Sequence, residues 1–193
     1  AGHDLNYIGL SGALHYASPA GNVPQTPPTL LGDIGGGALY LVIGILSGLL
    51  RVKETGEGSV VDAAIVDGSA HMMNLWMSMQ ETGSVEMKRG KSLLDGPHWS
   101  RCYICSDGKY ISVQCLEPKF YSIFLETLGI NKDPLFQSQH EKDQWRAQTD
   151  YLSKIFKKKP LAYWVNRFSD LDACVAPILD PEEAESDPHM KSR

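Results

Sequence analysis

The sequence has no excess of basic residues: 18 Lys and Arg stand against 23 Asp and Glu, a net charge of −5. This balance argues against nucleic acid or an anionic membrane surface as the main partner. Cysteine is scarce too, and four in 193 residues do not make a disulfide framework, which favours a reducing compartment. Internal repeats, low-complexity tracts and a secretory signal are missing as well. The remainder, with 42% hydrophobic and 21% charged residues, is typical of a soluble globular protein of one large or two small domains.

The two ends of the sequence lack the usual boundaries of a protein. It starts at Ala1, without an initiator methionine and directly within a motif. It stops at Arg193 without a closing helix or strand. We therefore expect a piece of a longer protein.

The apolar run from Ala38 to Leu50 falls short of the about 20 residues that a membrane-spanning helix needs. It predicts a buried helix, in which Gly44 and Gly48 share a face suited to close packing. Residues 60–64 then predict a short buried strand, and residues 65–79 a second apolar helix. The first part of the chain therefore has an α/β pattern.

The second part begins after a segment, 82–100, whose three glycines and proline predict a linker between domains. Alternating residues on both sides of Asp107-Gly108 predict a β-hairpin. Cys102 and Cys105 are three apart on one of its strands and so face opposite sides, which argues against a metal site. The basic run 157–159 is interpreted as the solvated end of a helix. Helices are expected at 118–128, 141–157, 160–168 and 181–186, which makes this part a small α+β unit.

Asp33 lies just before three glycines and the first apolar helix. The simplest interpretation is a helix N-cap, worth about 1 kcal/mol. That leaves Gly35, Gly36 and Gly37 unexplained, since three glycines cost roughly 2–3 kcal/mol in a helical turn. Glycines suit a place where a ligand approaches the backbone N–H groups, so these three are candidate ligand-binding residues. The spacing fits neither a Walker loop nor a dinucleotide fingerprint.

His3 and Glu117 are the other two candidate residues for chemistry. A lone histidine is more often a hydrogen-bonded surface or core residue than a catalyst, and Glu117 by default is an exposed carboxylate near a helix start. The residue types alone predict no more than an α/β enzyme piece with a glycine loop. The structural interpretation is preferred for the remaining histidines, namely His15, His71, His98, His140 and His189.

The stretches around these candidates together resemble the α-methylacyl-CoA racemases of the family III CoA-transferase superfamily. The resemblance covers nearly the whole chain. The stretches that carry it are Gly-His-Asp-Leu-Asn-Tyr at 2–7, Gly-Asp-Ile-Gly-Gly-Gly at 32–37, Thr-Gly-Glu-Gly at 55–58, Leu-Asp-Gly at 94–96, Asp-Gly-Lys-Tyr at 107–110, Glu-Pro-Lys-Phe-Tyr at 117–121 and Asp-Ala-Cys-Val-Ala-Pro at 172–177.

The resemblance implies a function and a fold. His3 and Asp33 match the family's catalytic histidine and aspartate, and Glu117 matches the glutamate that partners the histidine. They imply racemisation of 2-methylacyl-CoA esters by two-base 1,1-proton transfer through an enolate. The implied architecture is part of a Rossmann-like large domain (1–66), a helix and linker (67–97), a small α+β domain (98–180) and the start of a return linker (181–193).

Further expectations follow from the same resemblance. The substrate carries coenzyme A, so no separate cofactor and no metal are expected. The full-length protein is expected to be an interlocked homodimer in which Glu117 meets His3 and Asp33 of the partner, without nucleic acid or membrane partners. The expected location is the cytoplasm, or mitochondria or peroxisomes in a eukaryote.

The chain also departs from the racemase pattern. Thr29 stands where racemases usually have Asn, and residues 97–101 replace the usual Gly-Ala-Pro-aromatic continuation. The resemblance further implies that the family's N-terminal third, which supplies much of its CoA-binding surface, lies outside this sequence. Two alternatives therefore stay open: a family III CoA transferase with an acyl-Asp33 intermediate, and a non-catalytic fragment.

Overall fold

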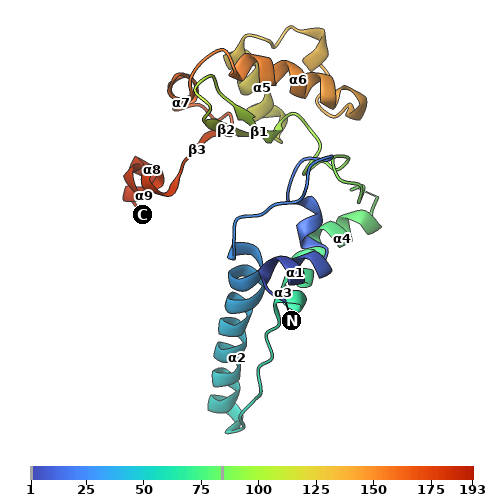
Figure 1. The fold of residues 1–193 in the computed structure, drawn as a ribbon, viewed down its shortest axis with the longest axis vertical. Coiled ribbons are helices and arrows are strands. Elements are labelled where there is room, and N and C mark those ends of the chain that lie inside the picture. The colour runs from blue at the N-terminus through green and yellow to red at the C-terminus, as the bar shows by residue number, and fades with distance from the viewer. Residues whose placement is uncertain (1, 84) are drawn as a thin grey trace. The chain divides into compact units, whose positions relative to one another are not determined.

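The computed structural model describes residues 2–83 and 85–193, which form two compact units that divide between Ser92 and Leu93 (Figure 1). The first unit is built from helices and extended loops, and the second combines helices with a small sheet. The mixed α/β character predicted from the sequence is confirmed. The finer domain boundaries stay predictions.

The first unit is organised around one long helical segment. It starts as a π-helix and continues without a break into α2. The helices of this unit are α1 (Asp4–Leu10), a 3-10 turn (Ala13–Tyr16), the π-helical segment (Leu30–Ala38), α2 (Leu39–Thr55), α3 (Ile65–Met72) and α4 (Asn74–Glu81).

Helix α2 ends where Gly56 adopts a left-handed conformation, with φ 73°, and donates its N–H to the carbonyl of Val52. The chain then returns along α2 in an extended form (Figure 1). A Cβ on Gly44 would lie 2.4 Å from a methyl carbon of Val61, so the close approach predicted for this glycine is confirmed. The strand predicted for 60–64 is wrong, because these residues pair with no strand and Val60 is 97% exposed.

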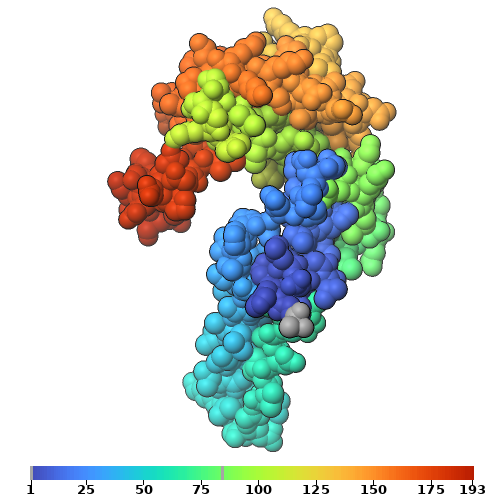
Figure 2. All heavy atoms as spheres, viewed as in Figure 1, coloured from blue at the N-terminus to red at the C-terminus, as the bar shows by residue number. Residues whose placement is uncertain are grey.

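The sequence also predicts that the apolar helix at residues 38–50 is buried, and in this chain α2 is not buried. No residue of α2 is buried, and many of its apolar side chains are exposed; atoms of this part of the chain lie at the surface in Figure 2. The helical segment Leu30–Thr55 has 26 residues and contains an 18-residue stretch with a mean hydropathy of 1.7, so by length and composition alone it could cross a membrane, a test that the core helix of a soluble protein also passes. The shortness of the run 38–50 therefore does not exclude a membrane span, and the absence of a membrane partner stays a prediction.

The second unit contains a three-stranded antiparallel sheet in the order β1-β2-β3. The predicted hairpin is confirmed, with Gly108 at φ 79° in its turn. The predicted helices are confirmed too, except that α6 starts after a separate 3-10 turn, Lys142–Gln144. The elements are β1 (Ser100–Ile104), β2 (Tyr110–Gln114), α5 (Pro118–Leu128), a 3-10 turn (Pro134–Phe136), α6 (Trp145–Phe156), α7 (Leu161–Phe168), β3 (Val175–Ile178), α8 (Pro181–Ser186) and α9 (Pro188–Lys191).

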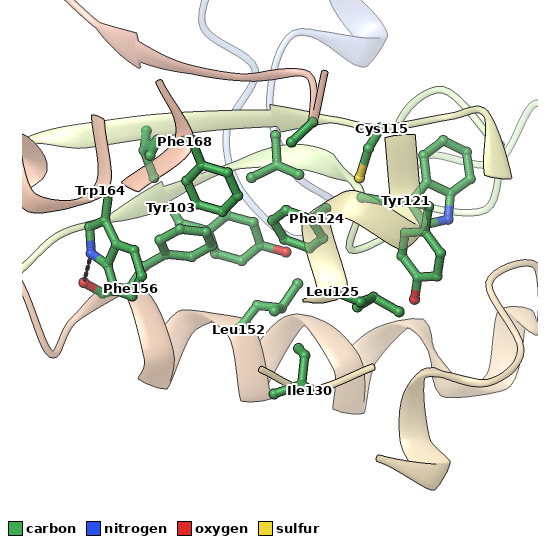
Figure 3. Packing of buried hydrophobic residues seen from close by; sticks show 14 of the residues in the cluster. Tyr103, Cys115, Tyr121, Phe124, Leu125, Ile130, Leu152, Phe156, Trp164 and Phe168 are labelled. Carbon is green, nitrogen blue, oxygen red and sulfur yellow. Dashed lines mark hydrogen bonds between the residues drawn. The ribbon is translucent and has the colours of Figure 1, made fainter. Parts of the chain in front are cut away.

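Aromatic side chains fill the core of the second unit (Figure 3). The ring of Phe156, on α6, stacks on Tyr103 of β1 at 5.0 Å between centroids and meets Trp164 of α7 edge-on at 5.1 Å. Trp99 is 1% exposed and belongs to this core, so the linker predicted for 82–100 is too long at its C-terminal end. The predicted linker is too long because glycine and proline indicate irregular backbone, and irregular backbone can also be part of a core.

The cysteines of the hairpin point to opposite sides, as predicted. Cys102 is exposed and Cys105 is buried, and all four cysteines of the chain are free thiols. Burial raises the pKa of the Cys105 thiol to about 11, so the neutral thiol packs as a small apolar group.

Candidate functional site

His3 stands at the start of α1, as its N-cap residue, with extended backbone angles. Its N–H donates to Oδ1 of Asn6 over 3.0 Å, and its carbonyl accepts from the Asn6 N–H over 3.0 Å. These two bonds fix the backbone of His3 at the helix start. The imidazole itself lies at the surface, available to a ligand.

Asp33 lies within the π-helical segment, in which the N–H of Ile34 bonds to the carbonyl of Thr29, five residues back, over 3.1 Å. Such wide turns are rare in proteins and occur frequently at functional sites. The N-cap interpretation of Asp33 is wrong, because Thr29 holds that position and Asp33 stands in the first turn. The carboxylate of Asp33 is on an exposed residue.

Asp4 connects these two places. Its Oδ1 atom accepts hydrogen bonds from the backbone N–H of Gly32 over 2.8 Å and of Asp33 over 2.9 Å. The Asp4 residue is only 7% exposed, and a Cβ on Gly32 would lie 2.3 Å from its Oδ1. The buried carboxylate therefore ties the backbone beside His3 to the backbone of Asp33, through contacts that charge strengthens.

Asp4 is not among the functional residues that the sequence motifs predict. The only available signal was its place directly after His3, in the Gly-His-Asp stretch. Its role depends on a contact with residues 28 and 29 positions further along, which no local pattern reveals.

The glycines after Asp33 pack against α3. A Cβ on Gly36 would lie 2.4 Å from the hydroxyl oxygen of Ser69, and one on Gly37 would lie 3.1 Å from Ile65. Gly36 and Gly37 are buried, whereas Gly35 is half-buried. The structure thus supplies a packing reason for two of the three glycines, and their role in ligand binding stays a prediction.

Glu117 belongs to the second unit, so its predicted meeting with His3 and Asp33 stays a prediction. It is the N-cap residue of α5, followed by Pro118, and its carbonyl accepts from the N–H of Tyr121 over 3.0 Å. The carboxylate makes no capping bond and belongs to an exposed residue. It therefore stays available for another partner.

Behind this helix start lies a buried pair, His98 and Tyr121. The Nε2 of His98 and the hydroxyl of Tyr121 are 2.8 Å apart, and the hydroxyl of Tyr103 donates to the carbonyl of His98. Burial lowers the pKa of His98 to about 3, and the charge of Arg101 adds to the shift. His98 is therefore neutral at physiological pH, and it anchors the first turn of α5, on which Glu117 stands.

The described residues, 2–83 and 85–193, contain no group of three or more His, Cys, Asp or Glu side chains that could hold a metal ion. The arrangement instead offers an exposed imidazole and an exposed carboxylate on one rigidly connected backbone. Such groups can accept and donate protons.

Comparison with known proteins places the chain in a family. The model of CoA-transferase family III matches residues 1–193. The α-methylacyl-CoA racemase of Mus musculus is 36% identical over 195 residues, which cover 100% of this chain and 51% of that protein. The acetyl-CoA:oxalate CoA-transferase of Acetobacter aceti is 26% identical over 184 residues, covering 88% of this chain and 46% of that protein.

A solved structure shows the same fold. The CAIB/BAIF family protein from Brucella suis superposes with a TM-score of 0.77 at 24% identity, over 100% of this chain and 52% of that one. The chain belongs to CoA-transferase family III and has its mixed α/β fold. It spans about half the length of the curated relatives that it matches.

Proposed function

We propose that the complete protein is an acyl-CoA racemase that interconverts the epimers of a 2-methylacyl-CoA. The observation that carries this proposal is the Asp4 carboxylate, which ties the backbone beside His3 to that of Asp33. Two proton-transferring groups held on one framework suit the removal of a proton from a carbon and its return. The 36% identity to a racemase over the whole chain supports the same reaction.

In the proposed reaction, one of the two groups takes the proton from the carbon next to the thioester carbonyl. The electron pair of the broken C–H bond moves into an enolate, whose oxygen needs preorganised hydrogen-bond donors. The other group delivers a proton to the opposite face of the same carbon, so that the product has the composition of the substrate and the inverted configuration. An imidazole exchanges protons near neutral pH, which suits His3 for one of these roles.

Glu117 is proposed to act on His3 in the assembled protein. A carboxylate beside an imidazole orients the ring and stabilises its protonated form, as in a catalytic triad. The exposed carboxylate at the start of α5, held by no capping bond, suits this role. In the proposed homodimer it comes from the partner subunit.

A second candidate is a CoA transferase, and the 26% identity to an acetyl-CoA:oxalate CoA-transferase favours it specifically. In that reaction the carboxylate of Asp33 attacks the thioester carbonyl, and an acyl-Asp33 anhydride forms as the CoA thiolate leaves. The reaction needs Asp33 and has no role for a histidine–glutamate pair. A third candidate, a non-catalytic fragment, predicts neither reaction.

One experiment separates the three. The complete protein is incubated with a 2-methylacyl-CoA in D₂O, with and without a free carboxylic acid as acceptor. Deuterium exchange at the 2-position without CoA transfer supports the racemase, and transfer without exchange supports the transferase. If neither exchange nor transfer is detected, the non-catalytic interpretation is supported.

Substitutions then test the residues. His3→Ala and Asp33→Asn are each expected to abolish exchange for at least one epimer. The matched controls are His15→Ala and Asp62→Asn, two exposed residues of the same unit that take no part in the proposed chemistry. Full exchange activity in His3→Ala or Asp33→Asn would remove that residue from the mechanism.

A further inference from the structure

Two lysines of the basic run 157–159 line a pocket, in addition to following the end of α6. Lys158 and Lys159 line a pocket of the second unit together with Lys154, from the last turn of α6, and Arg167, from α7. The cavity volume is about 470 Å³, within the roughly 300–1,000 Å³ typical of small-molecule sites. None of the residues proposed for the α-proton chemistry lines it.

The charge inside this pocket is strongly positive, although the whole chain carries a net charge of −5. Among the described residues, none of the four cations forms an ion pair, and no acidic residue lines the pocket. Within α6, Asp150 stands four residues before Lys154, a spacing at which opposite charges attract, but the ion pairs among the described residues do not include these two. Such a concentration of unpaired positive charge is stabilised when an anion binds.

Cations are favourable at the C-terminal ends of helices, but this effect does not explain why four cations gather at this pocket. The C-terminal ends of α5 and α6 each carry about half a negative charge. Two carboxylates lie near these cations: Asp133 is beside the hydroxyl of Tyr151, and Asp107 accepts the N–H of Leu161, two residues after Lys159, over 3.0 Å. The four full positive charges exceed these contributions together, so the pocket attracts anions.

The backbone that carries the lysines is held in place. The indole N–H of Trp164 donates to the carbonyl of Phe156 over 3.0 Å, a bond drawn in Figure 3, and to that of Lys159 over 3.2 Å. The N–H of Ser106 also donates to the Lys159 carbonyl, over 3.0 Å. Arg167 is fixed by a 2.8 Å bond from Nε to the carbonyl of Thr127. A preorganised site of this kind loses less conformational entropy when a ligand binds.

Two tyrosine rings stand at the same pocket. Tyr151 is 37% exposed and Tyr163 is 40% exposed. The ammonium group of Lys159 lies 5.4 Å from the centre of the Tyr163 ring, so a cation and an aromatic face are adjacent. Exposed aromatic rings stack on nucleobases, and adjacent cations bind phosphates.

We propose that this pocket binds a nucleotide, with its polyphosphate group on Lys154, Lys158 and Arg167 and its base against a tyrosine ring. Two sources share this chemistry: a free nucleotide such as ADP, and the nucleotide end of a CoA ester. The proposal concerns a binding site only and does not depend on the proposed racemase reaction.

Calorimetric titration of the complete protein with ADP tests the proposal. We expect saturable binding that Lys158→Ala weakens about tenfold, the loss of one charge-assisted contact. Lys157→Ala is the matched control, because Lys157 is the neighbouring exposed lysine and does not line the pocket. Absence of ADP binding, or an equal loss in both variants, would overturn the proposal.

Further ligands test the base and identify the source. Pyrophosphate, which has the two phosphates of ADP but no base, is expected to bind more weakly than ADP, and equal binding would overturn the nucleotide assignment. CoA is titrated into the wild type and Lys158→Ala. If Lys158→Ala binds CoA about tenfold more weakly than the wild type, the ligand is the nucleotide end of CoA. If the variant loses affinity for ADP but binds CoA as tightly as the wild type, the ligand is a free nucleotide.

Discussion

The buried carboxylate of Asp4 accepts the backbone N–H of Asp33 over 2.9 Å and that of Gly32 over 2.8 Å. Asp4 follows His3 directly in the chain, so one carboxylate links the positions of two predicted catalytic residues. Asp4 is therefore a positioning residue in the proposed function, one that acts through the backbone.

Replacement of Asp4 tests this role. Asp4→Ala removes both hydrogen bonds, and we expect deuterium exchange to slow about 100-fold, the effect of a displacement of roughly 1 Å. Asp4→Asn keeps an oxygen that can accept both bonds and is expected to retain most of the activity. The measurement is kcat and KM for exchange in the complete protein. A merely structural role would lower the amount of folded enzyme and leave kcat per folded molecule unchanged in Asp4→Ala.

Thr29 has an unfavourable backbone conformation. Its φ of 63° lies in the left-handed region, which β-branched residues rarely adopt. The racemase pattern has Asn at this position, and Asn and Gly tolerate that conformation. We expect Thr29→Asn and Thr29→Gly to raise the free energy of unfolding by about 1 kcal/mol, measured by urea titration. Thr82→Asn is the control, since Thr82 has a φ of −82° and gains nothing from the change. Equal stability of the Thr29 variants and the wild type would mean that this conformation costs nothing.

Gly68 is a position where a side chain does not fit. A Cβ there would lie 1.9 Å from the carbonyl oxygen of Gly36, a backbone atom that cannot move without shifting the π-helical segment. We expect Gly68→Ala to destabilise the first unit by at least about 3 kcal/mol and to reduce exchange activity. Gly48→Ala is the matched control: its Cβ would make an ordinary contact of 3.9 Å with Ser59, and the helix interior favours Ala by about 1 kcal/mol. Thermal unfolding followed by circular dichroism measures both, and an unchanged Tm in Gly68→Ala would contradict the packing.

Local patterns predicted the second unit well, because its hairpin and helices are bounded by short-range signals. Asp107-Gly108 specifies the turn, Pro118 the first turn of α5, and Asp180 with Glu183 the capping box of α8. In the first unit the same reasoning failed for the strand at 60–64 and for the burial of α2. Apolar periodicity indicates that a face needs a partner, but it does not show whether that partner lies in the same 193 residues.

The candidate site was predictable only in part. His3, Asp33 and Glu117 were identified through their motifs, whereas the π-helical turn at Asp33 and the role of Asp4 were not. Both depend on contacts between distant parts of the chain. The glycine run also illustrates the limit, since packing against Ser69 and ligand approach require the same residue type.

His98 makes the stability of the second unit depend on pH. Its pKa is about 3 in the folded protein, because of burial first and then the charge of Arg101, against about 6.5 when the chain is unfolded. Between these values the unfolded chain binds a proton that the folded protein does not. The stabilisation is therefore fully present above about pH 6.5 and is lost as the pH falls towards 3, with a slope of about 1.4 kcal/mol per pH unit.

The measurement is the free energy of urea unfolding at pH 7, 6, 5 and 4, followed by the fluorescence of Trp99, Trp145 and Trp164 in the second unit. His98→Gln is expected to be less stable than the wild type at pH 7 and to lose stability less steeply at lower pH, because glutamine does not titrate. The buried, non-titrating Gln148 supplies the control: Gln148→Met removes the bond from Nε2 to the carbonyl of Leu135 and should lower stability equally at every pH. If the stability of His98→Gln changed with pH as steeply as that of the wild type, His98 would not cause the pH dependence. Folding would then not lower the pKa of the imidazole, and the imidazole would have to be accessible to water.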